Sequence, residues 1–452
     1  TFIIGFRMNG ELDFDDILYF PEEIVTEKIA NDILVISVTT ANWIVLKNKI
    51  QLSLLNKLRE GWMIGQVVEE IESEEEMASF KSLLAAIFAR KFAGVGVLPT
   101  KEYLEGYKML NIYITNACNL RCKHCFMRSG TKLKSELSLE NWIGILSDFK
   151  VSGGENVTFS GGEPLMFKGF ANILKHAHDI GLKVTVLSNG LLWTENMIEE
   201  LAPFIDEIQF SIDGVNERTN AVVRGEGNFD VVVETVVKFS NLGVKTSVST
   251  TFTYENLEDD TDVRYKELVV AVRRRTSNEV FFKLSKKLLP GRNVNISSEE
   301  NEKYSKRIKG IESFVDKNAD YENFIAGHSP NLIAKNCGLG GMSINADGSV
   351  YFCNRIYEVE SYGNVLEHPI SYFMEKGKEI HEETSVDNVE PCSGCFLRYI
   401  CDGGCRIDDF DFSGKLKNTV KPYRQITCTD EKKHKLMKRM IDSFDYFYDF
   451  DS

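Results

Sequence analysis

The sequence predicts an α/β protein whose central part consists of parallel strands joined by helices. The alternation of strand-like and helix-like segments between 110 and 290 supports this prediction. The chain has 452 residues, and all ten cysteines lie between Cys118 and Cys428, a segregation that favours metal clusters over disulfides. The length indicates roughly two or three domains. With 43% hydrophobic residues, each domain can form an ordinary packed core.

The composition excludes several classes of function. A net charge of −14 repels the phosphate backbone, so we do not expect nucleic acid to be the main partner. No run reaches the ~18 apolar residues of a membrane span, and the N-terminus lacks the charged-then-apolar order of a secretory signal. We therefore expect a cytoplasmic protein with no membrane partner. The chain begins at Thr1 rather than Met, so we expect a few residues to precede it in the native protein.

Residues 1–95 are predicted to form a small winged helix-turn-helix-like module. The runs 32–38 and 43–48 are rich in β-branched residues and should pair as a hairpin, and 50–61 and 77–94 have helical apolar spacing. The module has 9 Lys and Arg against 15 Asp and Glu, a balance of −6, which argues against DNA binding. A linker is expected over 96–109.

Residues 110–295 contain six strand candidates separated by helical stretches. Alternation at this spacing indicates parallel strands with crossover helices. The strands are expected at 110–115, 156–160, 183–188, 206–212, 244–252 and 279–285, and helices at 138–150, 168–180, 195–202 and 229–242.

A cysteine-rich loop follows the first of these strands. Cys118, Cys122 and Cys125 lie within eight residues, so one loop can direct three thiolates toward one soft metal centre. A structural zinc site needs a fourth ligand, which His124 could supply by folding back. A 4Fe-4S cluster accepts three cysteines if another molecule binds the fourth iron. The spacing favours the cluster and leaves both possibilities open.

The loop and the GGEP run at Gly161, Gly162, Glu163 and Pro164 resemble the radical S-adenosylmethionine (SAM) superfamily. The resemblance implies a partial (β/α)6 TIM barrel, a 4Fe-4S cluster on Cys118, Cys122 and Cys125, and SAM as the ligand of the fourth iron. It also implies that GGEP holds the methionyl amino group of SAM. The chemistry is expected at the C-terminal ends of the strands.

Polar residues at three other places match the same family. The resemblance implies that Ser188 and Asn189 contact the SAM ribose, that Ser211 and Asp213 line the site, and that Arg224 pairs with the SAM carboxylate. The alternative is that the two strand ends are ordinary turns and that Arg224 is a surface residue.

The other seven cysteines match the pattern of the SPASM domain, expected over 337–430 after a bridging region at 296–336. Seven cysteines do not divide into closed zinc sites of four. The resemblance implies two auxiliary 4Fe-4S clusters, one on Cys392, Cys395, Cys401 and Cys428 and the other on Cys337, Cys353 and Cys405. All ten cysteines are then assigned, so one iron of the second auxiliary cluster should be open. A C-terminal helix and acidic tail are expected over 431–452.

Taken together, these patterns resemble the radical SAM/SPASM peptide maturases that form sactipeptide and ranthipeptide thioethers. The N-terminal module looks like the precursor-recognition domains of such enzymes, although it could be a purely structural cap. The implied partners are a short precursor peptide with a leader and an electron donor such as flavodoxin or ferredoxin. Asn354 stands where sulfatase-maturing relatives have an Asp base, which favours a thioether. Carbon-carbon or carbon-oxygen crosslinking, epimerisation and a non-catalytic iron-sulfur electron carrier are the alternatives.

Overall fold

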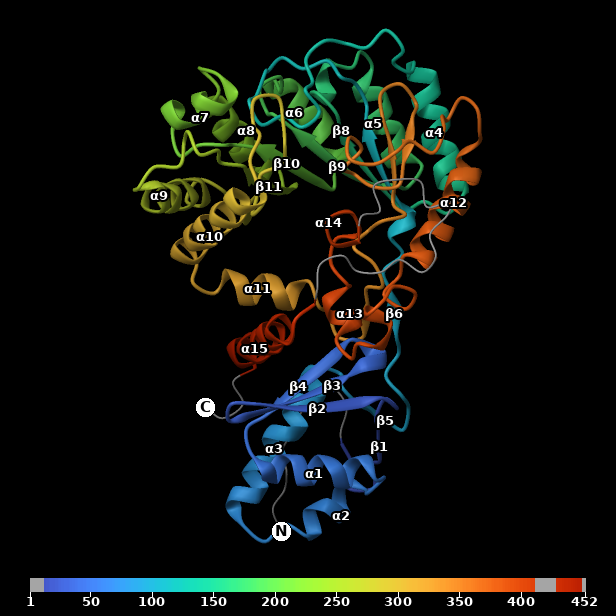
Figure 1. Ribbon diagram of the computed structural model, residues 1–452, viewed down its shortest axis with the longest axis vertical. Helices are drawn as coiled ribbons and strands as arrows, with labels where there is room; N and C mark the ends of the chain where they lie inside the picture. Colours follow the sequence, from blue (N-terminus) through green and yellow to red (C-terminus); the bar gives the residue numbers. More distant parts are fainter. Residues whose placement is uncertain (1–11, 411–427, 449–452) are drawn as a thin grey trace.

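The computed structural model describes residues 12–410 and 428–448. Residues 411–427 of the predicted SPASM domain and 449–452 of the predicted acidic tail lie outside these ranges. The molecule is elongated, with the N-terminal module at one end and a layered α/β domain at the other (Figure 1). The helices α11 (Ala319–Ala326) and α15 (Asp430–Phe447) and part of the cysteine-rich segment lie between them.

The central sheet has eight strands in the order β12-β11-β10-β9-β8-β7-β14-β15. Strands β7 to β12 pair in parallel with their neighbours in sequence, which confirms the predicted parallel sheet. Among the described residues, no strand pairs with the free side of β12, so the sheet forms a partial barrel that does not close. The six strands are β7 (Met109–Tyr113), β8 (Asn156–Ser160), β9 (Lys183–Ser188), β10 (Glu207–Ser211), β11 (Lys245–Thr250) and β12 (Val280–Leu284).

A hairpin from the C-terminal part of the chain extends this sheet. β14 (Met342–Ile344) pairs in parallel with β7, and β15 (Val350–Tyr351) pairs antiparallel with β14. Nothing in the sequence of either segment predicts the place of this hairpin beside β7. It brings the segment that begins at Cys353 next to the strand that precedes the first cysteine loop.

Helices follow the strands as the alternation predicts. Ser138 caps α4 through the backbone N–H of Asn141, and the apolar side chains of α4 recur every three or four residues and are buried. Two further helices, α7 and α9, were not among the four segments predicted. The helices are α4 (Leu139–Val151), α5 (Phe170–Asp179), α6 (Glu195–Leu201), α7 (Glu217–Arg224), α8 (Phe229–Asn241) and α9 (Thr261–Arg273).

The N-terminal module is an antiparallel sheet of three strands followed by three helices. The order is β2-β3-β4, and the pairing of β3 with β4 confirms the predicted hairpin. β2 was missed because polar and apolar residues mix along it, as is common in an edge strand. The elements are β2 (Ile24–Ile29), β3 (Asp32–Ser37), β4 (Asn42–Leu46), α1 (Lys49–Arg59), α2 (Ile64–Glu69) and α3 (Glu74–Ala89), flanked by a pair of short strands, β1 (Leu18–Tyr19) and β5 (Gly94–Val95).

The module shares its hydrophobic core with distant parts of the chain. Trp43 is fully buried, and its indole N–H donates to the Met440 carbonyl at 3.2 Å. The buried guanidinium of Arg90 stacks over the Trp43 ring and donates to the His328 carbonyl. We call this set of contacts the shared core. Its members from outside the module are Phe324, Ile333, Leu397, Ile400, Met437, Met440, Ile441 and Phe444.

The remaining elements connect these parts. α10 (Ser298–Val315) packs against α9, and β6 (Glu102–Tyr103) pairs with β13 (Leu332–Ile333). α12 (Ile370–Glu383) precedes the cysteine-rich segment, which contains α13 (Arg398–Cys401) and continues into α14 (Arg406–Phe410). Within the described ranges, no helix combines the length and the apolar character needed to cross a membrane.

Candidate functional site

A cavity of about 340 Å³ lies at the carboxyl ends of the parallel strands. This volume lies in the range of small-molecule and cofactor sites. Five consecutive strands each contribute a hydroxyl residue at or just after their last position: Ser160, Ser188, Ser211, Thr251 and Ser285. Since the strands are parallel, their ends meet at one edge of the sheet, as in full barrels.

The three cysteines of the first loop all line this cavity. The loop is closed at its base because Gly130 donates to the Asn116 carbonyl at 2.7 Å and Cys118 donates to the Gly130 carbonyl at 3.1 Å. Burial raises the pKa of Cys118 to about 11 and also raises the pKa of Cys122, so metal ligation must displace protons. The loop therefore presents three sulfurs to one enclosed space.

His124 does not fill the fourth ligand position that a zinc site would need. Its Nε2 lies 3.1 Å from Oδ2 of Asp213, a buried carboxylate. Among the described residues, no three His, Cys, Asp or Glu side chains converge as ligands of a single metal ion. Each cysteine of an iron-sulfur cluster binds a different iron, so three sulfurs spread around a cavity fit a cluster better than one zinc ion.

The glycine pair allows the end of β8 to approach the cysteine loop. Gly162 donates to the Thr115 carbonyl at 2.7 Å, and Glu163 donates to the Ala117 carbonyl at 2.9 Å. A Cβ atom on Gly162 would lie 2.1 Å from the Ala117 carbonyl oxygen, and Gly161 has a φ of 126°. Both glycines line the cavity, and only residues without a side chain fit there.

The Glu163 carboxylate lies behind the cavity wall. It is fully buried, and it accepts hydrogen bonds from the Ser188 hydroxyl at 2.8 Å and from the Asn189 backbone N–H at 2.7 Å. Burial raises the pKa of Glu163 to about 7 despite these two donors. Glu163 thus fixes the end of β9, whose Ser188 and Asn189 do line the cavity. Pro164 is buried at the start of a short 3-10 helix and takes no part in the wall.

Arg224 reaches the cavity from the end of α7. Its Nε lies 2.6 Å from Oδ2 of Asp213, and its Nη1 lies 3.8 Å from the Cys122 sulfur. Burial alone would raise the pKa of Asp213, but Arg224 and His124 hold it at about 2. Asp213 is 1% exposed and lies outside the wall, so it orients Arg224 and His124 from behind.

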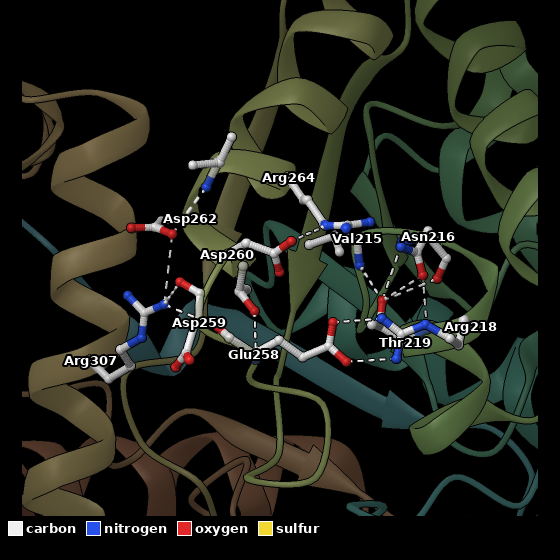
Figure 2. A network of polar contacts seen from close by, with 12 residues as sticks. Val215, Asn216, Arg218, Thr219, Glu258, Asp259, Asp260, Asp262, Arg264 and Arg307 are labelled. Atoms are coloured by element: carbon white, nitrogen blue, oxygen red, sulfur yellow. Dashed lines mark hydrogen bonds and ion pairs between the residues drawn. The ribbon is translucent and has the colours of Figure 1, made fainter.

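A polar network on the surface fixes α7 against the loop that follows β11 (Figure 2). Arg218 of α7 donates through both terminal nitrogens to the Glu258 carboxylate, each at 2.6 Å. Asn256 of the same loop donates to the backbone carbonyls of Asp213 and Thr219. The helix that carries Arg224 is therefore held at both the surface and the interior.

A second group of cysteines lies near the first loop. Burial, together with the nearby Cys337 and Cys405, raises the pKa of Cys353 to about 11, so these three residues lie together. We call them the cysteine trio. The segment after Cys353 packs on the first loop, because Ile356, Tyr113 and Met127 form one small cluster beside Cys125. Tyr113 also donates to the Asn354 carbonyl at 2.5 Å.

The other four cysteines lie in the C-terminal part of the chain; Cys395 packs against the shared core, and Cys392 belongs to the core of the central sheet. Cys392 and Cys395 share a tight turn in which Cys395 donates to the Cys392 carbonyl at 2.9 Å. Cys401 ends α13, whose neighbours Leu397 and Ile400 belong to the shared core. Cys428 directly precedes α15.

Several residues of the cavity wall were not predicted from the sequence. Gln209 could have been found, because it lies two positions before Ser211 and so faces the same side of β10. Thr251 and Ser285 lie at the C-terminal ends of the predicted strands 244–252 and 279–285, and they directly follow β11 and β12. Lys287 could not be predicted from its neighbours in the sequence, because the residue that it pairs with, Asp408, is 121 positions away.

Comparisons with known proteins agree with this geometry. Residues 112–265 match the family model of the Radical SAM superfamily. The sporulation killing factor maturation protein SkfB of Bacillus subtilis (strain 168) is 34% identical over 154 residues, which cover 34% of this chain and 37% of SkfB. The PqqA peptide cyclase of Bradyrhizobium diazoefficiens is 27% identical over 328 residues, which cover 68% of this chain and 83% of that protein.

A solved structure shows the same fold. Native anSMEcpe with bound AdoMet superposes with a TM-score of 0.52 at 18% identity, covering 76% of this chain and 100% of that one. The chain spans 37%, 63% and 38% of the length of three curated relatives that it matches.

Proposed function

We propose that this chain, in which residues 112–265 form a radical SAM domain, is a cytoplasmic maturase of a short, ribosomally made precursor peptide. One observation carries the proposal: a single cavity gathers the three loop cysteines, the glycine pair and the strand ends, and the cysteine trio lies beside the same loop. A non-catalytic electron carrier would need no such cavity next to its cluster.

The residues of the cavity fit an iron-sulfur cluster with SAM. Cys118, Cys122 and Cys125 would hold the cluster, and the wall formed by Gly161, Gly162, Ser188, Asn189, Ser211 and Arg224 would hold SAM. When bound, these groups supply a 5'-deoxyadenosyl radical that removes a hydrogen atom from the peptide. The task of the chain is to orient the peptide and to exclude water, for which Glu163 and Asp213 fix the wall from behind.

We assign the C-terminal cysteines to a SPASM domain with two auxiliary clusters. Cys392, Cys395, Cys401 and Cys428 would close one of them. The cysteine trio would hold the other and leave one iron without a ligand from a cysteine of this chain. In support, two carboxylates close to the trio, Glu358 and Asp408, are already paired with Arg355. A vacant iron is a soft site that suits a peptide thiolate.

The proposed product is an intrapeptide thioether, and the similarity to SkfB, a maturation protein, supports action on a peptide. A flavodoxin or ferredoxin would supply the electron. The N-terminal module would bind the leader along the outer edge of β2, because no other described strand pairs there. This edge is half-exposed, whereas β4 is buried along its whole length.

The test uses the enzyme without its first cluster and a Cys-bearing precursor peptide encoded beside its gene. Adding the peptide should change the spectrum of the auxiliary iron, while the Cys-to-Ser peptide should not. Complete enzyme with SAM and reductant should release 5'-deoxyadenosine and remove two hydrogen atoms from the Cys-bearing peptide. If both peptides leave the iron spectrum unchanged, direct sulfur ligation is wrong.

A carbon-carbon or carbon-oxygen crosslink is the second candidate. It is favoured by the similarity to a PqqA peptide cyclase, which covers 68% of this chain. Modification of the Cys-to-Ser precursor would identify this product class, because no thioether can form without the thiol.

A further inference from the structure

Arg355 contacts two of the three sulfurs of the cysteine trio. Its backbone N–H lies 3.5 Å from the Cys353 sulfur, and its Nη1 lies 3.4 Å from the Cys405 sulfur. Both distances are within the reach of N–H donors to sulfur. The side chain is only 17% exposed, so water competes weakly for these contacts.

Two carboxylates fix the position of the guanidinium. Glu358 accepts from Nε at 2.7 Å and also pairs with Nη2, and Asp408 Oδ2 lies 3.0 Å from Nη1. The same Oδ2 atom accepts from Lys287 at 2.7 Å, and Lys287 lines the cavity at the strand ends. Arg355 is thus held between the trio and the wall of the cavity.

Arg406, another arginine near the trio, contacts Cys337 through its backbone N–H, and its side chain is engaged elsewhere. Its guanidinium donates to the backbone carbonyls of Thr384 at 2.7 Å, Asp402 at 3.0 Å and Gly404 at 2.7 Å. It is fully buried, so it shapes the loop that carries Cys405. The Arg355 side chain, by contrast, directs one nitrogen at a cysteine sulfur.

The charge of Arg355 should stabilise the reduced state of a cluster on the trio more than the oxidised state. A thiolate-bound iron-sulfur cluster gains one negative charge when it is reduced, and hydrogen bonds to its sulfurs then strengthen. A cationic donor strengthens them more than a neutral one. Removing the guanidinium should therefore destabilise the reduced state.

We propose that Arg355 is a positioning residue that raises the reduction potential of the cluster carried by Cys337, Cys353 and Cys405. The inference rests on the proposed function, because it takes the trio as cluster ligands. A higher potential makes this cluster an easier electron acceptor than it would be without the guanidinium.

The experiment measures midpoint potentials by redox titration with electron paramagnetic resonance. The parent is full-length, reconstituted enzyme with Cys118→Ala, Cys122→Ala and Cys125→Ala, so that only auxiliary clusters contribute. Arg355→Gln should lower one of the two auxiliary midpoints and leave the other in place. Arg355→Lys keeps the charge but loses the planar guanidinium. Its midpoint potential should lie between those of the parent and of Arg355→Gln.

Arg275→Gln is the matched control. It removes an arginine paired with the Glu234 carboxylate at 2.6 and 2.7 Å, far from the trio in sequence, and changes the net charge equally. Both midpoints should equal those of the parent. Equal midpoints in Arg355→Gln and Arg275→Gln would overturn the inference about Arg355.

Iron content separates this failure from failure of the proposed function. If the parent holds only one auxiliary cluster and its midpoint is the same in Arg355→Gln, the trio carries none, and the assignment of two auxiliary clusters falls together with the inference about Arg355. If it holds two and Arg355→Gln shifts neither, only the inference about Arg355 falls. If Arg355→Gln does not retain iron, Arg355→Lys is measured in its place. A midpoint of Arg355→Lys equal to that of the parent would then overturn the inference.

Discussion

Oδ2 of Asp213 lies 2.6 Å from Nε of Arg224; Asp213 is buried behind the wall of the candidate active site, and Arg224, whose side chain is only 9% exposed, belongs to that wall. Breaking a buried ion pair from one side leaves the other charge without a partner, which costs roughly 3–5 kcal/mol. Asp213→Asn should therefore lower the unfolding temperature clearly. Asp260→Asn is the matched control, because its pair with Arg264 is nearly half-exposed and worth at most about 1 kcal/mol.

The pH dependence of this effect follows from the depressed pKa of Asp213. Arg224 and His124 hold that pKa at about 2, below the usual 3.8, so the stabilisation is complete above the usual value and is lost as the pH falls through about 2. The difference in unfolding temperature between Asp213→Asn and the parent should not shrink as the pH falls from 8 to 5. A difference that disappears within this range would contradict the assignment.

Gly162→Ala should abolish SAM binding and reduce the iron held by the first loop. The added Cβ would lie 2.1 Å from the Ala117 carbonyl oxygen, so the loop and the end of β8 must separate. Gly144→Ala is the control, since a Cβ there meets no atom within 4 Å and alanine favours a helix interior by about 1 kcal/mol. Equilibrium binding of SAM and iron analysis measure both effects. Normal SAM affinity in Gly162→Ala would show that this close approach is dispensable.

Replacing Cys118, Cys122 and Cys125 together by Ala should abolish release of 5'-deoxyadenosine under anaerobic, reducing conditions. The three sulfurs line the same cavity, and no described side chain lies in a position to replace them as a ligand group. Iron content should fall from about twelve to about eight per chain, because two auxiliary clusters of four irons remain. Release of 5'-deoxyadenosine by this variant would remove the basis of the proposed function.

Thr26→Pro should weaken binding of the leader peptide several-fold, since each main-chain hydrogen bond contributes about 1 kcal/mol. Val38 donates to the Glu23 carbonyl, so Glu23 faces β3, and the register pairs Thr26 with Val35 without a bulge. Because successive residues of an antiparallel strand direct their backbone N–H groups to opposite sides, the N–H of Thr26 points away from β3, to the free edge of β2. Proline there removes one outward donor and leaves the β2–β3 ladder intact. Thr26→Ala, which keeps the N–H, should bind the leader normally. Equal affinities of the two variants, measured by fluorescence anisotropy, would exclude recognition at this edge.

Deletion of residues 1–95 is a poorer test of the same idea. The sequence suggests a separate module, but Trp43 and Leu55 belong to a core that also contains Ile400 and Met440. Deletion would expose these apolar side chains, so lost activity would not identify a binding role.

The sequence predicted local structure well where the signal is local. Each of the six parallel strands is a short segment with at least one β-branched residue, and the first loop is defined by three cysteines within eight residues. Pairings between distant segments were not predicted. The contact of β14 with β7 joins residues 342 and 110, and no periodic pattern in either segment indicates the other.

The site residues show the same limit. Ser188, Ser211 and Arg224 were placed at the site from motifs, and they line the cavity. Glu163 and Asp213 come from equally good motifs but turn toward the protein interior. After Ser211 the chain leaves β10, so the strand alternation no longer determines where the Asp213 side chain points.

The shared core also limits which parts of this chain can be exchanged with those of a relative. The face of β4 that carries Trp43 is covered by α15, which lies almost 400 positions later in the sequence and is fixed by the Trp43–Met440 hydrogen bond. A chimera that exchanges only residues 12–95 with those of a relative would set a foreign sheet against a native C-terminal helix. Transfer of peptide specificity would therefore require both ends of the chain to be exchanged as one piece.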